Sequence, residues 1–182
     1  MKVEATALPE VLLIRPDVHR DPRGWFLETW NAKRYAAHGV AATFVQDNHS
    51  SSARGTLRGL HAQRRRPQGK LVRVVSGEIF DVAVDGRVGS PSFLMWVGVT
   101  LTAADATQCW VPPGFAHGFC VLGERADVEY KCTEPYDAGD ELRIRFDDPE
   151  IGVRWPIKDP VVSPADLAAK SVREVYDLLP RR

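Results

Sequence analysis

Three side chains in this sequence of 182 residues are of types that can move a proton or stabilise the charge it leaves behind. His61 follows the segment "RGTLRGL", Lys70 begins "KLVRVV", and Tyr130 lies within "DVEYKCT". A neutral imidazole can remove a proton near physiological pH, and a lysine ammonium can stabilise the oxyanion that forms at a neighbouring carbonyl. A tyrosine across the same cavity can return a proton to the opposite face. Together these residue types describe inversion at a carbon next to a ketone, which is one candidate reaction among others.

Each of these residues also has a purely structural interpretation. His61 could be a core histidine bonded to a backbone carbonyl, and Tyr130 could be a core tyrosine whose hydroxyl finds a partner. Lys70 could be a surface lysine that lays its stem on apolar neighbours. A fourth candidate, Asp166, lies three residues after Ser163 in "SPADL", where an acid at the start of a helix needs no further role. The residue types alone leave these interpretations open.

A metal site at His61 would need a partner that the sequence does not provide. The motif "CWVPPGFAHGF" places His117 after a Pro-Pro-Gly turn, as in the second of two motifs found in cupin barrels. The first cupin motif has two histidines one residue apart, whereas this sequence has His61 and Gln63. We therefore expect no metal centre. The sequence also contains no glycine-rich dinucleotide fingerprint, so we expect no nicotinamide or flavin cofactor.

The composition excludes several classes of partner. Lys+Arg and Asp+Glu both number 24, and a formal net charge of zero argues against a nucleic-acid partner, although a few placed arginines could still bind phosphate. Cys109, Cys120 and Cys132 form no CxxC motif, which is typical of reduced thiols in a cytoplasmic protein. The N-terminal apolar run Val11–Ile14 is too short for a signal peptide or a membrane span. We expect a cytoplasmic protein without a membrane partner.

Short strands separated by Gly, Pro and Asp must position the candidate residues. β-branched and aromatic runs broken at Ser76-Gly77 and at 86–91 are the clearest signal. Many short strands at even spacing predict an all-β, jelly-roll barrel with short helices at its edges, and the mouth of such a barrel is the default ligand site. The predicted strands lie near 43–48, 57–62, 70–76, 78–84, 92–101, 108–111, 118–122, 126–133 and 141–146.

Two helices are predicted from their end signals. The segment "NAKRYAAHG" predicts a short helix with Asn31 as its cap and Gly39 as its stop. Ser163 as a cap and Pro164 at the first helical position predict a C-terminal helix over about 164–179. No repeat or linker interrupts the chain, so we expect one domain over 1–182.

At this level of detail the sequence resembles the dTDP-4-dehydrorhamnose 3,5-epimerase family of nucleotide-sugar biosynthesis, from about residue 8 to 168. The resemblance implies a cupin-like jelly roll, also called a double-stranded β-helix. It further implies a homodimer in which the N-terminal segments, about 1–30, cross to the partner subunit. The motifs that carry it are "DPRGWFLETW", "FVQDNHSSSARGTLRGLHAQ", "PQGKLVRVVSGEIFDVAVD", "WVPPGFAHGF", "EYKCTEPY" and "DDPEIGVRWP".

The same resemblance implies a role for each candidate residue. His61 corresponds to the base, Tyr130 to the acid on the other face, and Lys70 to the group facing the enolate oxygen at sugar C4. Asp166 corresponds to the carboxylate that holds the imidazole in its basic tautomer. The implied substrate-binding positions are Arg58 near the sugar and phosphates, Gln46 and Asn48 on the nucleotide-contacting strand, His117 and Glu141 in the pocket, and Arg23, Phe26 and Glu28 on the crossing segment that completes the neighbour's site.

Two positions depart from the family pattern. Ala62 stands where the family usually has a tyrosine, and Ala165 stands where a lysine often precedes the helix aspartate. Both departures replace a long polar or aromatic side chain at the rim of the site with a methyl group. They bear on the detail of the substrate more than on the type of reaction.

The reaction implied by the resemblance is epimerisation of dTDP-4-dehydro-6-deoxy-D-glucose at C3 and C5 to dTDP-4-dehydro-L-rhamnose. One alternative is a relative that epimerises a single carbon, which needs the same base. A ketoisomerase on the same barrel usually has paired histidines where this chain has His61 and Gln63. A non-catalytic cupin that only binds a sugar nucleotide would need no base, so the joint presence of His61, Tyr130 and Asp166 argues against it.

Overall fold

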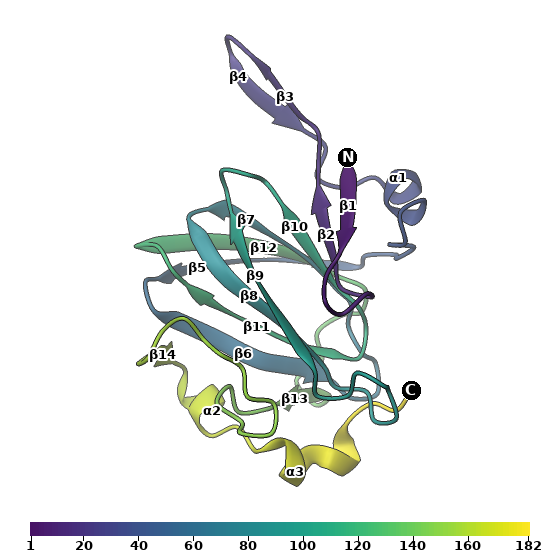
Figure 1. Cartoon of the computed structure of the whole chain (residues 1–182), viewed down its shortest axis with the longest axis vertical. Coiled ribbons are helices and arrows are strands. Elements are labelled where there is room, and N and C mark those ends of the chain that lie inside the picture. Colours follow the sequence, from purple (N-terminus) through teal and green to yellow (C-terminus); the bar gives the residue numbers. More distant parts are fainter.

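Two sheets packed face to face form the body of the molecule, and the structure, a computed structural model, describes residues 1–182 (Figure 1). The predicted all-β jelly roll with short peripheral helices is confirmed. In spatial order the first sheet contains β1 (Lys2–Ala5), β2 (Leu12–Arg15), β10 (Gln108–Val111), β7 (Lys70–Ser76), β12 (Arg125–Cys132) and β5 (Gln46–Ala53). The second contains β13 (Glu141–Arg143), β6 (Thr56–Gln63), β11 (Phe115–Val121), β8 (Glu78–Asp85) and β9 (Trp96–Thr102), with β14 (Val161–Val162) beside β6.

The remaining elements lie around these sheets. They are the hairpin of β3 (Val18–Asp21) and β4 (Gly24–Leu27), the helices α1 (Ala32–Ala36), α2 (Pro164–Leu167) and α3 (Val172–Val175), and the 3-10 turn η1 (Tyr176–Leu178). None of the helices is long and apolar enough to cross a membrane.

A single glycine carries the chain from the first sheet to the second. Gly77 separates β7 from β8 and has a φ of +82°, which L-residues with a side chain rarely adopt. A Cβ at this position would also collide with the backbone carbonyl of Arg125. The apolar residues of the two strands therefore end on facing sheets, where they join the core that includes Val72, Ile79 and Phe119.

The helices cover the outer faces of the sheets. A second apolar cluster packs residues of β6, β8 and β11 against α3, and a third packs β2, β7 and β10 against α1. Tyr35 of α1 is fully buried in this third cluster, where its hydroxyl donates to Gln108 at 2.8 Å. No helix lies between the sheets, so the space there is lined mainly by strand residues.

Two glycines bring β6 and β11 unusually close together. A Cβ at Gly59 would lie 2.6 Å from the Cα of Gly118, so neither position has room for a side chain. The register of the two strands shifts between His117 and Phe119 at this point. On one side of the shift His61 and His117 are direct register partners, which sets two histidines side by side on the second sheet.

The predicted C-terminal helix over 164–179 is wrong, because the chain makes two short helices there. The first, α2, ends at the cap residue Ala168. Ser171 then caps α3, where its side chain accepts from the backbone N–H of Glu174 while the Glu174 carboxylate accepts from the backbone N–H of Ser171. This reciprocal pair starts a new helix in the middle of the predicted one.

Several other boundaries differ from the predicted ones. The strand expected at 43–48 begins at Gln46 and continues to Ala53, and the strand expected at 92–101 begins only at Trp96. Residues 91–94 form turns instead, and the hydroxyls of Ser90 and Ser92 donate to the buried Asp85 carboxylate at 2.6 and 2.7 Å. The strand expected at 141–146 ends at residue 143. The helix capped by Asn31 is confirmed, and its cap accepts from the backbone N–H of Arg34.

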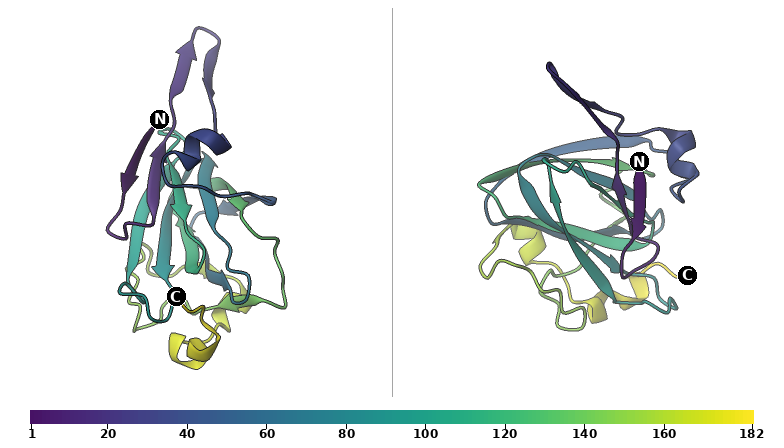
Figure 2. Two further views of the ribbon diagram at one scale, coloured as in Figure 1. Left: turned by 90° about the vertical axis from the view of Figure 1, so that its right-hand side faces the viewer. Right: turned by 45° about the horizontal axis from the view of Figure 1, so that its top comes forward.

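The hairpin β3–β4 projects away from the body of the molecule (Figure 2). Trp25 and Phe26 on this hairpin are 64% and 70% exposed. The preceding strands β1 and β2 pair with each other and with β10 of the same chain. Only the hairpin part of the N-terminal segment therefore lacks packing partners within the chain.

Candidate active site

A cavity of about 180 Å³ is lined by residues of both sheets. Strands β5, β7 and β12 of the first sheet and β6 and β13 of the second contribute to it. It brings together six of the twelve residues predicted for the site. The lining residues are Gln46, Asn48, His61, Ala62, Gln63, Gln68, Lys70, Tyr130, Tyr136 and Glu141.

His61 on β6 is held by Asp166 of α2. The imidazole Nε2 lies 2.7 Å from the Asp166 Oδ1, and the Asp166 side chain is only 6% exposed. A carboxylate can only accept, so Nε2 carries the proton and Nδ1 keeps its lone pair. Burial by itself raises the pKa of Asp166, but the hydrogen bond from His61, the contact with Ser163 and the charge of Arg143 together hold it below its ordinary value. Asp166 is therefore held as a carboxylate, and in the neutral form of His61 it selects the tautomer whose Nδ1 can accept a proton.

The start of α2 positions this carboxylate. The Ser163 hydroxyl accepts from the backbone N–H of Asp166 at 3.1 Å, as in an ordinary helix cap. Asp166 thus occupies the capped first turn predicted for it and also contacts the histidine. Its structural and functional interpretations are compatible.

Lys70 is buried at the first residue of β7, which rules out the surface-lysine interpretation. Its ammonium makes no hydrogen bond and no ion pair within the chain. Burial lowers the pKa of Lys70, and the nearby Cys132, Asp81 and Glu141 offset this effect only in part. A buried cation without a partner favours an anion beside it, so Lys70 is suited to stabilise an oxyanion in the cavity.

Tyr130 projects into the same cavity from β12. Val128 and Cys132, two residues away on either side, are buried on the same face, as strand alternation predicts. The hydroxyl has no hydrogen-bond partner within the chain. Burial raises the pKa of Tyr130, the nearby Cys132 adds to this effect, and Arg58 acts in the opposite direction. The phenol therefore keeps its proton at neutral pH and is available as an acid.

Gln46, Asn48 and Glu141 present amide and carboxylate groups at the cavity wall. The Gln46 amide donates to the Asn48 side-chain oxygen at 2.9 Å and accepts from the backbone N–H of Tyr136 at 2.8 Å. The Glu141 carboxylate accepts from the Tyr136 hydroxyl at 3.2 Å. Tyr136 was not identified from the sequence, although it ends the quoted motif "EYKCTEPY".

The structure does not bring the other predicted residues into this cavity. His117 is buried and does not line it; its Nε2 lies 2.7 Å from Asp81 Oδ1. Arg58 is exposed on β6, and its Nε donates to the Ser52 hydroxyl at 3.1 Å. The three N-terminal residues lie outside the cavity. Arg23 pairs with Asp21 and Glu28 pairs with Arg34, both within the N-terminal segment, and Phe26 is exposed.

Gln63 has a structural role that the sequence did not reveal. Its amide donates to the backbone carbonyls of Arg66 and Pro135 and accepts from the backbone N–H of Asp137. It therefore ties two loops together beside the cavity. Nowhere in the structure do three or more His, Cys, Asp or Glu side chains gather in a group that could hold a metal ion.

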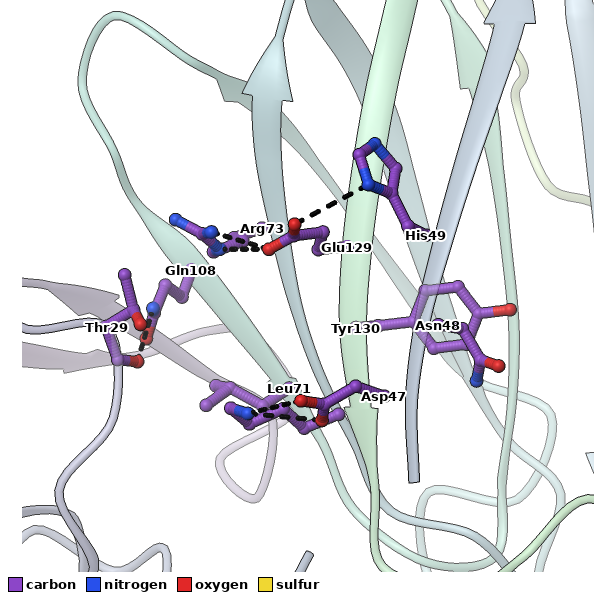
Figure 3. Close-up of a pocket in the computed structure, with 10 residues that line it drawn as sticks. Thr29, Asp47, Asn48, His49, Leu71, Arg73, Gln108, Glu129 and Tyr130 are labelled. Carbon is purple, nitrogen blue, oxygen red and sulfur yellow. Dashed lines mark hydrogen bonds and ion pairs between the residues drawn. The ribbon is translucent and has the colours of Figure 1, made fainter. Parts of the chain in front are cut away.

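A second hollow, of about 190 Å³, lies on the outer face of the first sheet (Figure 3). Its charged side chains are matched with one another: Lys131 donates to Asp47 at 2.9 Å, and Arg73 donates to Glu129 at 2.9 Å. Figure 3 shows the Tyr130 ring pointing away from the pair of Arg73 and Glu129. The inner cavity, by contrast, holds His61 with its carboxylate partner and the unpaired Lys70, so we take it as the candidate active site.

Two facing sheets that enclose a histidine–carboxylate pair, a lysine and a tyrosine define a cupin-like jelly-roll protein with an acid–base site. The family model of dTDP-4-dehydrorhamnose 3,5-epimerase matches residues 5–174, and the chain belongs to this family.

Individual relatives show the same likeness. The dTDP-4-dehydrorhamnose 3,5-epimerase of Neisseria gonorrhoeae is 52% identical over 172 residues, which are 94% of this chain, and the chain spans about half (52%) of that relative's length. The crystal structure of dTDP-6-deoxy-D-glucose-3,5-epimerase from Legionella pneumophila, in complex with dTDP-4-keto-L-rhamnose, is 47% identical with a TM-score of 0.96 and covers 100% of this chain and 98% of that one. A 3'-monoepimerase from Streptomyces bikiniensis, in complex with dTDP-quinovose, is 30% identical with a TM-score of 0.90, covering 97% and 92%.

Proposed function

We propose that this chain epimerises dTDP-4-dehydro-6-deoxy-D-glucose at C3 and C5 to give dTDP-4-dehydro-L-rhamnose. The observation that carries the proposal is the cavity in which His61, bound to Asp166, faces the same space as Lys70 and Tyr130. Membership of the epimerase family and the identity of 47–52% to named 3,5-epimerases support it. The roles of the individual residues follow from their geometry and chemistry.

His61 is the base in this proposal. Its Nδ1 removes the proton from a carbon next to the C4 ketone, and the electron pair of the broken C–H bond moves toward the ketone oxygen. The Asp166 carboxylate accepts from Nε2–H throughout and stabilises the imidazolium that forms. The Lys70 ammonium stabilises the enolate oxygen, which is the charge that develops as the proton leaves.

Tyr130 is the acid that completes the inversion. Its hydroxyl delivers a proton to the enolate carbon on the face opposite His61, and the C4 ketone re-forms. The step ends with a protonated imidazole and a phenolate, and a proton returns from the one to the other through solvent before the next turnover. The raised pKa of Tyr130 fits this role because it keeps the phenol protonated before the step.

In this proposal, the polar residues of the cavity wall and residues of a second subunit bind the nucleotide part of the substrate. Gln46, Asn48 and Glu141 line the cavity beside the acid–base groups, and Arg58 lies near enough to Tyr130 to affect its pKa. The projecting hairpin is assigned to a homodimer in which it reaches the neighbour's cavity, with Arg23, Phe26 and Glu28 completing that site. The exposure of two aromatic side chains on a two-stranded ribbon supports this, because such a ribbon is marginally stable alone in water.

A second candidate function is epimerisation of one carbon only. The likeness to the Streptomyces bikiniensis 3'-monoepimerase favours it, because that protein has a closely similar fold. Both reactions need the same base, so the residues of the cavity do not separate them.

Proton exchange in deuterated water tests both candidates. The protein is incubated with dTDP-4-dehydro-6-deoxy-D-glucose, and deuterium incorporation is followed by NMR at C3 and at C5 separately. We expect incorporation at both carbons together with formation of the L-rhamno product. Incorporation at one carbon only would establish the single-carbon alternative. The absence of incorporation at either carbon, with binding retained, would point to a non-catalytic binding protein.

A further inference from the structure

Arg143 lies beside the proposed base on the neighbouring strand, and its guanidinium contacts two carboxylates. It is the last residue of β13, and its register partner on β6 is His61. One guanidinium nitrogen, Nη2, lies 2.6 Å from Glu141 Oε2, and Nε lies 3.8 Å from Asp166 Oδ1. Arg143 is therefore the cation that joins a residue of the cavity wall to the partner of the base.

The Nε–H of Arg143 is buried and has no hydrogen-bond acceptor. Asp166 Oδ1, the same atom that accepts from His61, lies 3.8 Å from this nitrogen. Leaving a buried donor without a partner costs free energy. A small shift of the guanidinium toward Asp166 would close the 3.8 Å distance to a hydrogen bond and remove this cost. The guanidinium is thus placed to act on the same carboxylate oxygen that the imidazole contacts.

Arg143 acts through its neighbours, because it is not among the residues that line the cavity. Without it, the carboxylates of Asp166 and Glu141 would remain close together with no cation between them. Asp166 is almost fully buried, so repulsion between these like charges is poorly screened by water. Asp166 would then be driven to take up a proton or to turn away from His61, and either change removes the acceptor that fixes the imidazole tautomer.

We propose that Arg143 is a positioning residue of the acid–base site, which keeps Asp166 ionised and aimed at His61 by bridging it to Glu141. This inference rests on the proposed function, because it assigns Arg143 a part in the same proton transfer. It predicts that the charge of residue 143 controls the chemical step and has little effect on substrate binding.

The test compares three variants under steady-state conditions with dTDP-4-dehydro-6-deoxy-D-glucose. For Arg143→Gln we expect kcat to fall by about 10- to 100-fold, by analogy with the partners that orient metal-binding histidines, while KM stays nearly unchanged. Arg143→Lys keeps the cation and should recover most of the lost kcat. Arg145→Gln is the matched control, because Arg145 lies two residues further on and pairs with Asp147 on the surface at 2.7 Å.

A second readout does not depend on turnover. In wild type and in Arg145→Gln, the His61 ring should show a proton on Nε2 in ¹⁵N–¹H NMR, and this tautomer signature should be lost or mixed in Arg143→Gln. If Arg143→Gln does not fold, as judged by circular dichroism, Arg143→Met keeps the apolar stem and is measured in its place. An unchanged tautomer and kcat in the folded variant, or a lysine variant as impaired as the glutamine variant, would overturn the inference. An inactive wild type would instead contradict the proposed function.

Discussion

His61 and Asp166 are 105 positions apart in the chain, yet the imidazole Nε2 lies 2.7 Å from the carboxylate Oδ1. The same aspartate donates its backbone N–H to Ser163 at the start of α2. A helix cap therefore fixes the backbone of the residue that fixes the histidine. Nδ1 is the nitrogen that Asp166 leaves free to act as a base, so the orientation of the base depends on how α2 begins.

Replacing the proposed base should abolish turnover without unfolding the protein. For His61→Asn we expect kcat to fall by roughly 10²- to 10⁴-fold, because loss of a general base removes the group that accepts the proton. His38→Asn, at an exposed position in the turn after α1, is the control and should behave as wild type. Activity near that of wild type in a correctly folded His61→Asn protein would rule out this assignment.

Removing the Tyr130 hydroxyl should impair inversion more than proton removal. In Tyr130→Phe, His61 still forms the enolate and Lys70 still stabilises it, so the proton often returns from the face it left. We expect measurable deuterium incorporation at C3 or C5 while product formation falls further, with both rates measured by NMR in one sample. Tyr176→Phe, at an exposed tyrosine, is the control. Equal reduction of the two rates would make Tyr130 a packing residue.

Activity should not require a metal or a redox cofactor. The acid–base groups of the cavity suffice for proton transfer, and His61 has no neighbouring metal ligand at position 63. We expect full turnover after exhaustive chelation and dialysis, without added nicotinamide or flavin. Loss of turnover in chelator that a divalent ion restores would contradict this expectation.

Complementation between subunits should show whether the hairpin completes a neighbour's site. Arg23→Ala and His61→Asn are each expected to be inactive as homodimers. Mixed dimers formed by subunit exchange contain one site with both native residues, so part of the activity should return. The mixed species must be verified by native mass spectrometry. If verified mixed dimers stay inactive, Arg23 acts within its own chain or not at all.

Asp85 should make the stability of the protein depend on acid pH. Burial raises the pKa of Asp85, but hydrogen bonds from Arg87, Ser90 and Ser92 outweigh it and lower the pKa to about 2 from the ordinary 3.8. A lowered pKa in the folded state stabilises the protein above the unfolded value, and this contribution is lost as the pH falls toward 2. At about 1.4 kcal/mol per pKa unit, the contribution at neutral pH is about 2 kcal/mol.

Urea unfolding across pH provides the measurement. Above about pH 5 the Asp85 carboxyl is ionised in both the folded and the unfolded protein, so the difference in free energy of unfolding between wild type and Asp85→Asn should be constant there. This difference should shrink as the pH falls from 4 to 2. Asp177→Asn, at an exposed acid without a hydrogen bond, should leave the free energy nearly unchanged throughout. A difference between wild type and Asp85→Asn that does not change with pH would show that the Asp85 cluster stabilises by packing alone.

Local sequence signals were sufficient for much of the fold. The caps at Asn31 and Ser163, the alternation that turns Tyr130 inward and the strand over 70–76 were all predicted and are present. These features depend on residues within a few positions of one another, where backbone conformation and side-chain period determine the outcome. The continuous helical pattern of the C-terminal segment predicts a single helix, and the capping box of Ser171 and Glu174 divides it in two.

Only the tertiary structure decided which distant groups meet. Burial of Lys70, the pairing of His117 with Asp81, and the position of Arg143 between two carboxylates depend on how the sheets face each other. Strand period assigns a side chain to a face of its sheet, but it does not specify what lies opposite that face. The sequence by itself therefore determined the residue types and the local elements of the site, and the packing of the two sheets determined their contacts.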